Sequence, residues 1–367
     1  MIERKLESVN IPSSLEIGSL QLAMPLILAP MAGISDLPFR AMHRRYGCNL
    51  AFTEMISARS LAYGSRQTLS MLSMSDLDRP LGVQLLGNDP DVLVRTLDII
   101  HTMPFSLIDI NAACPVPKVT SRGEGAGLLR EDPKRIETLV GAVVRATHLP
   151  VTIKIRTGWD DDSLVAVSVA HAAEAAGASA ICVHGRTRMQ HYGGRVNREA
   201  IAEVKRTVKI PVIASGDAFS PRLIQRTFEE TGCDGVMIAR GALGNPWVFR
   251  DVMDYLSTGM CGERRSLAEI AAAMHDHLAL CCEYYGERGG TVLFRKFFTW
   301  YAKGIKTGRQ YKERVFSVTE QAAMKAVIDE LEQANLQVLP LYEAYDKEML
   351  DSLPDSHRRT GDLLQWQ

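Results

Sequence analysis

Residues 107–118, LIDINAACPVPK, join an apolar run to an amide, a thiol, two prolines and a lysine. The apolar run is typical of a buried strand, which places Asn111 and Cys114 at its C-terminal end. In a barrel of alternating strands and helices, that end of each strand carries the chemistry. A lone cysteine is more often a packed core residue, but the glycine-rich residues 121–127 that follow are typical of an active-site loop. We therefore interpret Cys114 as a candidate active-site residue.

Runs of the same kind recur along the first two thirds of the chain and alternate with segments of helical periodicity. The predicted strands are residues 26–29, 50–53, 81–85, 107–110, 151–155, 180–183, 212–214 and 235–238. The predicted helices between them include residues 91–101, 133–147, 163–176, 198–207 and 221–231. Alternation of this kind predicts a parallel sheet, and eight units over roughly 230 residues match a (β/α)8 TIM barrel of about 250 residues.

An open, doubly wound sheet is the alternative. It is disfavoured because no G-x-G-x-x-G follows the first predicted strand, where the chain reads APMAG from Ala29 to Gly33. After Asn245 and Pro246 only helical periodicity remains, over residues 266–285, 291–305, 319–334 and 340–350. We therefore predict a catalytic barrel over residues 1–247, an all-helical domain over residues 248–345 and a polar tail over residues 346–367.

Composition excludes several classes of protein. The chain has 367 residues, a formal net charge of −1 and 46% hydrophobic residues, as in soluble globular proteins. No apolar run reaches the ~18 residues that a membrane helix needs, and no signal peptide is evident, so we expect a cytoplasmic protein. Seven cysteines without a C-x-x-C pair argue against a metal site. We expect a monomer.

Polar residues follow nearly every predicted strand. In chain order they are Glu54, Gln84, Asn111, Lys154, Arg156, His184, Arg186, Ser215, Asp217 and Arg240. Glycines after the last two strands allow backbone N–H groups to approach a phosphate, although tight turns also use glycine. Gln84, Lys154 and His184 would surround one pocket and suit a planar ring such as a flavin, but they also suit another phosphorylated ligand.

In order and spacing, these motifs resemble the tRNA-dihydrouridine synthase family, most closely its bacterial B-type members. The resemblance covers about residues 20–320. It is carried by LAPMAGISDLPFR (28–40), FTEM (52–55), VQL (83–85), Asn111 with Cys114-Pro115 and Lys118-Val119, KIRTGW (154–159), HGRT (184–187) and ARGA (239–242).

The resemblance implies an FMN enzyme that uses NADPH to reduce uridines in tRNA. Around the flavin ring and ribityl chain it implies Pro30, Met31, Ala32, Gln84, Lys154 and His184; around the phosphate, Ser215, Gly216, Asp217, Ala239 and Arg240. Asn111 would contact the uracil and Cys114 would protonate its C5. Two positions depart from the family pattern: Ser215 stands where Asn is usual, and Ala113 stands where Gly is common.

The helical segment has a local excess of positive charge. Between residues 288 and 314 there are eight basic residues and one acid, Glu313. Six of them are our candidate contacts to the RNA backbone: Arg288, Arg295, Lys296, Lys303, Lys306 and Arg309. A solvated helix face is the simpler explanation of such a run.

Two alternatives to the tRNA enzyme remain open. An FMN barrel reductase that acts on a free pyrimidine or another small activated alkene would share the barrel and the flavin, but it would give no reason for the basic helices. A nucleic-acid-binding protein with a vestigial barrel is disfavoured because Cys114, Lys154 and His184 are all present.

Overall fold

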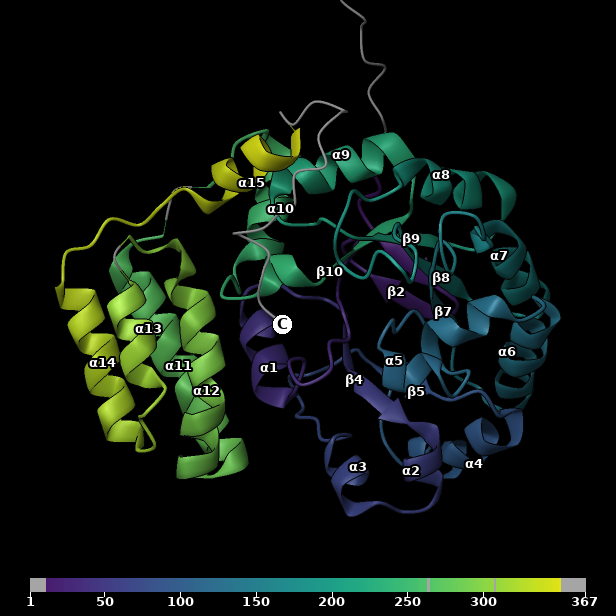
Figure 1. The fold of residues 1–367 in the computed structure, drawn as a ribbon, viewed down its shortest axis with the longest axis horizontal. Coiled ribbons are helices and arrows are strands. Elements are labelled where there is room, and N and C mark those ends of the chain that lie inside the picture. Colours follow the sequence, from purple (N-terminus) through teal and green to yellow (C-terminus); the bar gives the residue numbers. More distant parts are fainter. Residues whose placement is uncertain (1–10, 263–264, 307, 351–367) are drawn as a thin grey trace, which may run out of the picture.

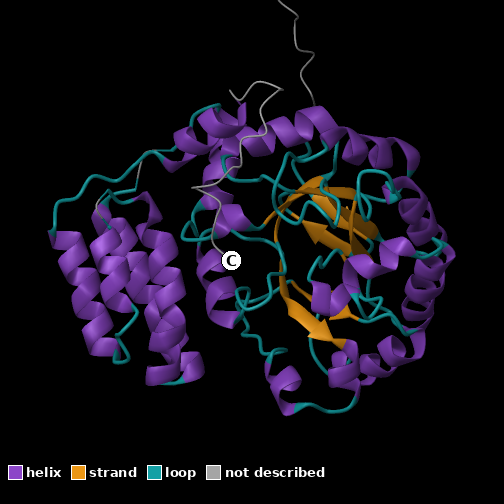
Figure 2. Cartoon of the chain, viewed as in Figure 1, coloured by secondary structure: helices purple, strands orange, loops and turns teal. Residues whose placement is uncertain are grey.

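The computed structural model describes residues 11–262, 265–306 and 308–350. Eight parallel strands form a closed barrel inside a ring of helices (Figures 1 and 2). The strands are β3 (Leu26–Leu28), β4 (Ala51–Ser57), β5 (Leu81–Leu86), β6 (Leu107–Ala112), β7 (Val151–Arg156), β8 (Ala180–His184), β9 (Val212–Ser215) and β10 (Gly235–Ile238). They pair in sequence order from β4 to β10, and β10 pairs with β3.

The barrel closes between β3 and β4. The amide of Leu28 donates to the carbonyl of Leu50 at 2.9 Å, and Ile27 and Leu50 form a parallel bridge. Every residue of β5, β6 and β7 is buried, as expected for strands that are covered on both faces. The predicted barrel and its eight strands are therefore confirmed.

An antiparallel hairpin that the sequence analysis missed precedes the barrel. It consists of β1 (Leu15–Ile17) and β2 (Leu20–Leu22). Leu15, Ile17 and Leu22 are buried in one cluster with Phe52 and other apolar side chains of the barrel strands. The hairpin thus extends the apolar packing of the barrel, in a cluster that also touches the predicted site residues Met31 and Ala239.

The surrounding helices begin and end at recognisable signals. They are α1 (Leu37–Arg45), α2 (Ala58–Ala62), α3 (Arg66–Ser70), α4 (Pro90–Ile100), α6 (Lys134–Ala146), α7 (Ala166–Ala175), α8 (Arg198–Thr207), α9 (Pro221–Thr231) and α10 (Val248–Thr258). For example, the Ser220 hydroxyl caps α9, Pro221 takes its first position, and Gly232 ends it in the left-handed conformation.

A bundle of helices lies beside the barrel in Figure 1. It contains α11 (Leu267–Tyr285), α12 (Glu287–Tyr301), α13 (Arg309–Val315) and α14 (Gln321–Gln333). Its core is continuous with that of the barrel: Phe39 of α1 stacks on Phe297 of α12, with 5.8 Å between the ring centres. The last helix of the described part of the chain, α15 (Leu341–Leu350), returns to the barrel and contacts α9. Among the described residues, no helix is long and apolar enough to cross a membrane.

Candidate active site

The strand register places polar residues of neighbouring strands side by side. Gln84 of β5 pairs with Asp109 of β6, and Asn111 pairs with Lys154 of β7. His184 of β8 pairs with Ser215 of β9. All six side chains are buried. Partners in a parallel register point to the same face of the sheet, so the members of each pair share a face.

A chain of hydrogen bonds connects several of these positions. The Thr152 hydroxyl donates to Asp109 Oδ1 at 2.6 Å, and Gln84 Nε2 donates to Asp109 Oδ2 at 2.7 Å. Asn111 Nδ2 donates to Gln84 Oε1 at 2.8 Å. Asn111 Oδ1 in turn accepts from the backbone amides of Ala113 (3.0 Å) and Cys114 (2.9 Å). The Asn111 side chain therefore fixes the backbone that carries the thiol.

The Cys114 segment is held from several sides. Its carbonyl accepts from the Ala126 amide at 3.0 Å, and the Ala113 carbonyl accepts from Arg156 Nε at 2.8 Å. Gly125 has a φ of +56°, and a Cβ there would lie 2.9 Å from the Cys114 carbonyl oxygen, so this approach requires glycine. Ala113 is outside the set of described residues with positive φ, so its backbone does not require the glycine that is common in the family.

The Cys114 residue is 9% exposed. Burial raises the pKa of its thiol above the ordinary value, while the Val116 backbone and Arg156 act in the opposite direction. A thiol in this environment keeps its proton at neutral pH, as a proton donor must.

Lys154 and His184 are both buried, and one ring nitrogen of the histidine is unsatisfied. His184 Nε2 has no hydrogen-bond partner in the part of the chain that the structure describes. Burial, followed by the positive charges of Arg156 and Lys154, lowers the pKa of His184 well below its ordinary value, so the ring is neutral. Buried polar groups are nearly always paired, so an orphaned imidazole nitrogen favours a ligand at this position.

The loops after β8, β9 and β10 form a cluster of positive charge. Arg186 Nη2 contacts both carboxylate oxygens of Asp217 at 2.9 Å, and Arg240 reaches Asp217 Oδ1 at 3.3 Å. One carboxylate is shared by two guanidinium groups, and buried Arg186 Nη1 has no partner among the described residues. Burial lowers the pKa of Arg240. The cluster has positive charge and donor capacity left for an anion.

Gly216 allows the Val196 side chain and the His184 ring to pack closely against the backbone beside this cluster. Its φ is +120°, and a Cβ would lie 2.6 Å from Val196 Cγ2 and 3.1 Å from the His184 ring. Ser215, predicted beside it, is also buried. Arg186 was not among the predicted phosphate contacts, although it immediately follows the His184-Gly185 pair and lies in this charged cluster.

The loop after β3, with Pro30, Met31 and Ala32, is tied to the helical bundle. Lys296 Nζ of α12 donates to the Gly33 carbonyl, and Gly33 N donates to Glu54 Oε2. Lys296, predicted to contact RNA, is therefore half-buried at the junction between barrel and bundle.

The other predicted RNA contacts divide into two groups. Arg295 Nε donates to the Val318 carbonyl at 2.9 Å within the bundle, and Lys303 Nζ donates to Tyr345 Oη of α15 at 3.1 Å. Both side chains therefore have partners within the protein. Arg288, Lys306 and Arg309 are exposed.

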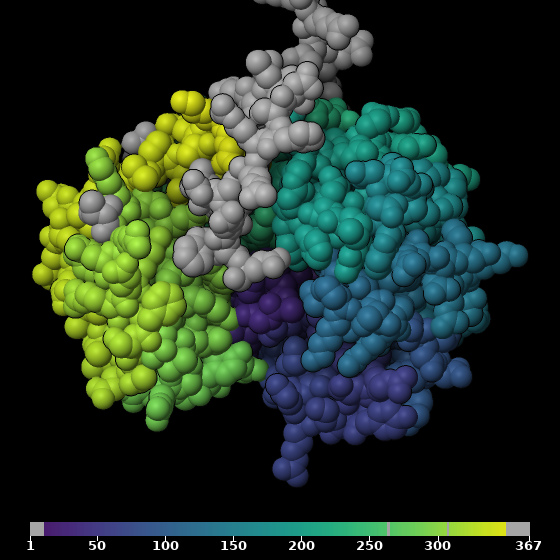
Figure 3. Space-filling view, in the orientation of Figure 1, coloured from purple at the N-terminus to yellow at the C-terminus, as the bar shows by residue number. Residues whose placement is uncertain are grey.

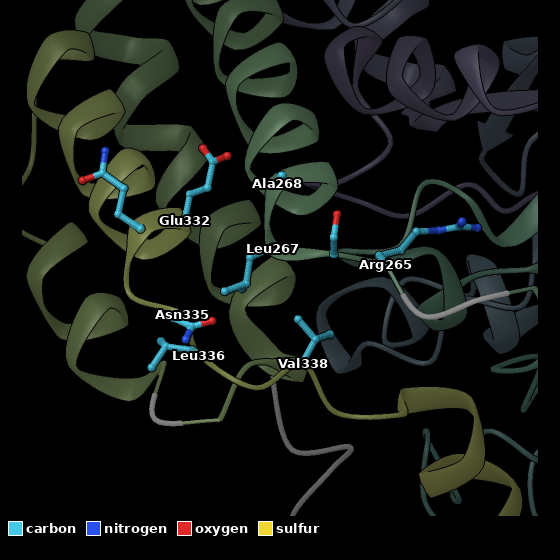
Figure 4. A pocket seen from close by; sticks show the side chains of 9 residues that line it. Arg265, Leu267, Ala268, Glu332, Asn335, Leu336 and Val338 are labelled. Atoms are coloured by element: carbon cyan, nitrogen blue, oxygen red, sulfur yellow. The ribbon is translucent and has the colours of Figure 1, made fainter.

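The space-filling view shows a hollow where barrel and bundle meet, with N-terminal residues, in purple, at its floor (Figure 3). A second hollow, a groove of about 620 Å³, lies between the start of α11 and the end of α14 (Figure 4). It is lined by Arg265, Leu267, Glu332, Leu336 and neighbouring residues, and by none of the predicted site residues.

Comparison with known proteins identifies similar chains. The family model described as dihydrouridine synthase matches residues 27–338. The tRNA-dihydrouridine synthase B of Pseudomonas aeruginosa is 40% identical over 300 residues, which are 82% of this chain and 90% of that protein. A probable tRNA-dihydrouridine synthase of Rickettsia conorii is 36% identical over 317 residues, or 86% and 96% of the two chains.

Among solved structures, histamine dehydrogenase from Rhizobium sp. 4-9 superposes with a TM-score of 0.52 and 13% identity. The alignment covers 73% of this chain and 50% of that chain. At this identity the likeness shows a shared barrel fold and nothing about substrate.

Proposed function

Since the chain belongs to the dihydrouridine synthase family, we propose that it reduces the C5–C6 double bond of uridines in tRNA, with bound FMN and with NADPH as the reductant. The observation that carries the proposal is the hydrogen-bonded set at the barrel mouth, in which Asn111 holds the backbone of Cys114 beside Gln84. An amide and a protonated thiol, fixed in one place, are what reduction of a uracil ring requires of the protein.

The residues around the barrel mouth fit FMN. The orphaned atoms of His184 and Arg186 favour an anionic ligand that also meets an imidazole. Ser215, Gly216, Asp217, Ala239 and Arg240, joined by Arg186, would hold the phosphate. Pro30, Met31, Ala32, Gln84, Lys154 and His184 would surround the ring and ribityl chain. When bound, the flavin supplies a hydride to C6 of the uracil.

Cys114 would deliver the proton to C5. Its raised pKa keeps the thiol protonated at neutral pH, and its backbone is held by Asn111 and by the segment around Ala126. Asn111 would bind the uracil. Its oxygen is already used by two backbone amides and one of its N–H groups by Gln84. The second N–H faces only the Met55 sulfur, at 3.9 Å, and is the one left for a substrate. A donor at this position suits a uracil carbonyl and stabilises the negative charge that develops on it.

The RNA must present the target base outside its stack, since the ring cannot be reached within a folded stem. The hollow between barrel and bundle is where we place that base (Figure 3). Arg288, Lys306 and Arg309 are the exposed candidates for contacts to the RNA backbone.

The test is a dihydrouridine map of RNA from cells that lack this gene and carry either the wild-type chain or Cys114→Ala. We expect loss at one or a few tRNA positions, restored by the wild type alone. A parallel assay offers the purified protein tRNA or free uracil, each with FMN and NADPH. Reduction of free uracil but not of tRNA would replace the proposal by a small-molecule reductase.

A further inference from the structure

Asp109 is the one buried carboxylate at the base of the hydrogen-bonded set, and the reaction proposed above leaves it without a role. It is 1% exposed and lies on β6, two residues before Asn111. Its oxygens accept from Thr152 and Gln84. Lys154 is the charged group that acts on it electrostatically. Among the described residues, no direct hydrogen bond joins the two side chains. A buried carboxylate is costly, so simple packing would favour an apolar residue here.

The chain from Asp109 to Cys114 has a fixed direction. An ionised carboxylate can only accept, so Gln84 must present its NH2 group to Asp109 and its oxygen to Asn111. At the other end, the backbone amides of Ala113 and Cys114 can only donate, so Asn111 must present its oxygen to them. Both ends require the same orientation of the two amides.

We propose that Asp109 is a positioning residue: by accepting from Gln84, it sets the amide orientation of Gln84 and Asn111 and thereby the position of Cys114. The part of the proposal that concerns catalysis rests on the proposed function. The part that concerns the position of Cys114 does not, because the hydrogen bonds exist without any substrate.

The decisive test is a double-mutant cycle of near-isosteric variants. In Asp109→Asn, the new amide can still accept from Gln84 if its NH2 group donates to the Thr152 oxygen. In Thr152→Val, the carboxylate still accepts from Gln84. In the double variant, the introduced amide has lost the hydroxyl that holds its orientation. We expect each single variant to stay within about twofold of wild type and the double variant to lose about tenfold, a coupling of the size seen in hydrogen-bond networks.

The measurement that does not depend on activity is alkylation of Cys114 by iodoacetamide. Cys261 is exposed and provides the reference in the same molecule. Peptide mass spectrometry gives the ratio of labelling at the two thiols. We expect this ratio to change several-fold in the double variant and in Asp109→Leu, and to stay near wild type in both single near-isosteric variants. The kcat on tRNA should fall in parallel while KM for tRNA stays constant.

Additive effects in the cycle, or an Asp109→Leu protein that is folded and labels Cys114 at the wild-type ratio, would overturn the proposal. If Asp109→Leu does not fold, the double-mutant cycle alone tests the proposal, because Asp109→Asn and Thr152→Val keep the shape of the side chains. Should the wild-type protein reduce no tRNA, the labelling ratios still test the role of Asp109, so failure of the proposed function is a separate result.

Discussion

At the scale of single residues, the protonation of Cys114 is the first consequence of its environment. A thiol with a raised pKa donates a proton over a wider pH range than a free thiol, because the protonated form persists above the ordinary value of 9.0. We expect any loss of kcat from thiol ionisation to begin at a higher pH than it would for a free thiol. A pH–rate profile in single turnover measures this, and a loss that begins near pH 8 would contradict the raised pKa.

Replacement of Cys114 tests that role directly. Cys114→Ala should lower kcat by about 10²–10⁴, the usual contribution of a positioned acid, and leave tRNA affinity unchanged. The measurements are single-turnover reduction and filter binding on the same preparation. Equal losses in both would mean that Cys114 holds the RNA or the fold rather than the proton.

The pKa of Asp109 makes a further prediction at this scale. Burial raises the pKa of this carboxyl to about 6 from an ordinary value of 3.8, with Thr152, Gln84 and Lys154 acting in the opposite direction. At a pH well below the ordinary pKa the carboxyl is protonated in both the folded and unfolded states, so its burial does not lower the free energy of unfolding. As pH rises from about 4 to 6, the unfolded state loses its proton first, so stability is lost, by on the order of 3 kcal/mol at neutral pH.

Asp109→Asn removes this pH dependence. The variant should therefore become more stable relative to wild type, with a larger difference in the free energy of unfolding, as pH rises from about 4 to about 7. Urea unfolding of the flavin-free variant and wild type at the two pH values measures this difference in stability. The contributions of the other carboxylates are the same in both proteins and cancel. A relative stability that is independent of pH would contradict the raised pKa.

At the scale of elements, the six basic residues of the helical region have different partners and should respond differently to charge reversal. Arg288→Glu and Arg309→Glu change exposed side chains, and the Arg309–Glu313 pair that is lost is a surface pair of little energy. Each variant should weaken tRNA binding and reduce the salt slope by about 1, with kcat unchanged. Arg145→Glu, on the exposed side of α6, is the matched control.

Lys296→Glu should behave differently, since it removes a donor to Gly33 and places a carboxylate near Glu54 and Asp36. We expect a lower melting temperature and a lower kcat, whether or not the affinity for RNA also falls. A Lys296→Glu protein of wild-type stability and kcat, with weaker tRNA binding alone, would make Lys296 an RNA contact like the exposed residues.

The same elements show what the sequence could and could not predict. The barrel strands were predictable because parallel strands that are buried on both faces form continuous apolar runs, such as residues 180–183. The β1–β2 hairpin was missed because its three-residue strands are too short to show a period. The direction of Lys296 toward Gly33 depends on how α12 packs against the barrel, which no local pattern contains.

The candidate site was predictable as a set of strand ends, but its connections were not. Alternation within β6 places Asp109 and Asn111 on one face, yet the bonds that join them through Gln84 come from the neighbouring strand. Asp109 was therefore assigned to an apolar run, although it is the base of the hydrogen-bonded set.

At the scale of the whole molecule, α15 joins three parts of the chain that are distant in sequence. Tyr345 stacks on Phe219 of the loop after β9 at 4.9 Å and accepts from Lys303 of the helical region. Phe219 also lies under the Arg240 guanidinium, 5.1 Å from its ring centre. The helix lies beyond residue 338, where the family match ends. It connects the helical region to the residues that we propose hold the phosphate.

Tyr345→Ala should therefore weaken FMN binding as well as lower stability, because Phe219 loses the ring that holds it against Arg240. We expect the dissociation constant for FMN to rise by about fivefold to tenfold, near the ~1 kcal/mol of an aromatic pair. Tyr342→Phe is the control on the same helix: it removes a 2.9 Å hydrogen bond to Asp251 and leaves the Phe219 contact in place. It should lower the melting temperature without changing FMN affinity. If both variants lose stability equally and neither changes FMN affinity, α15 fastens the helical region to the barrel and has no influence on the flavin site.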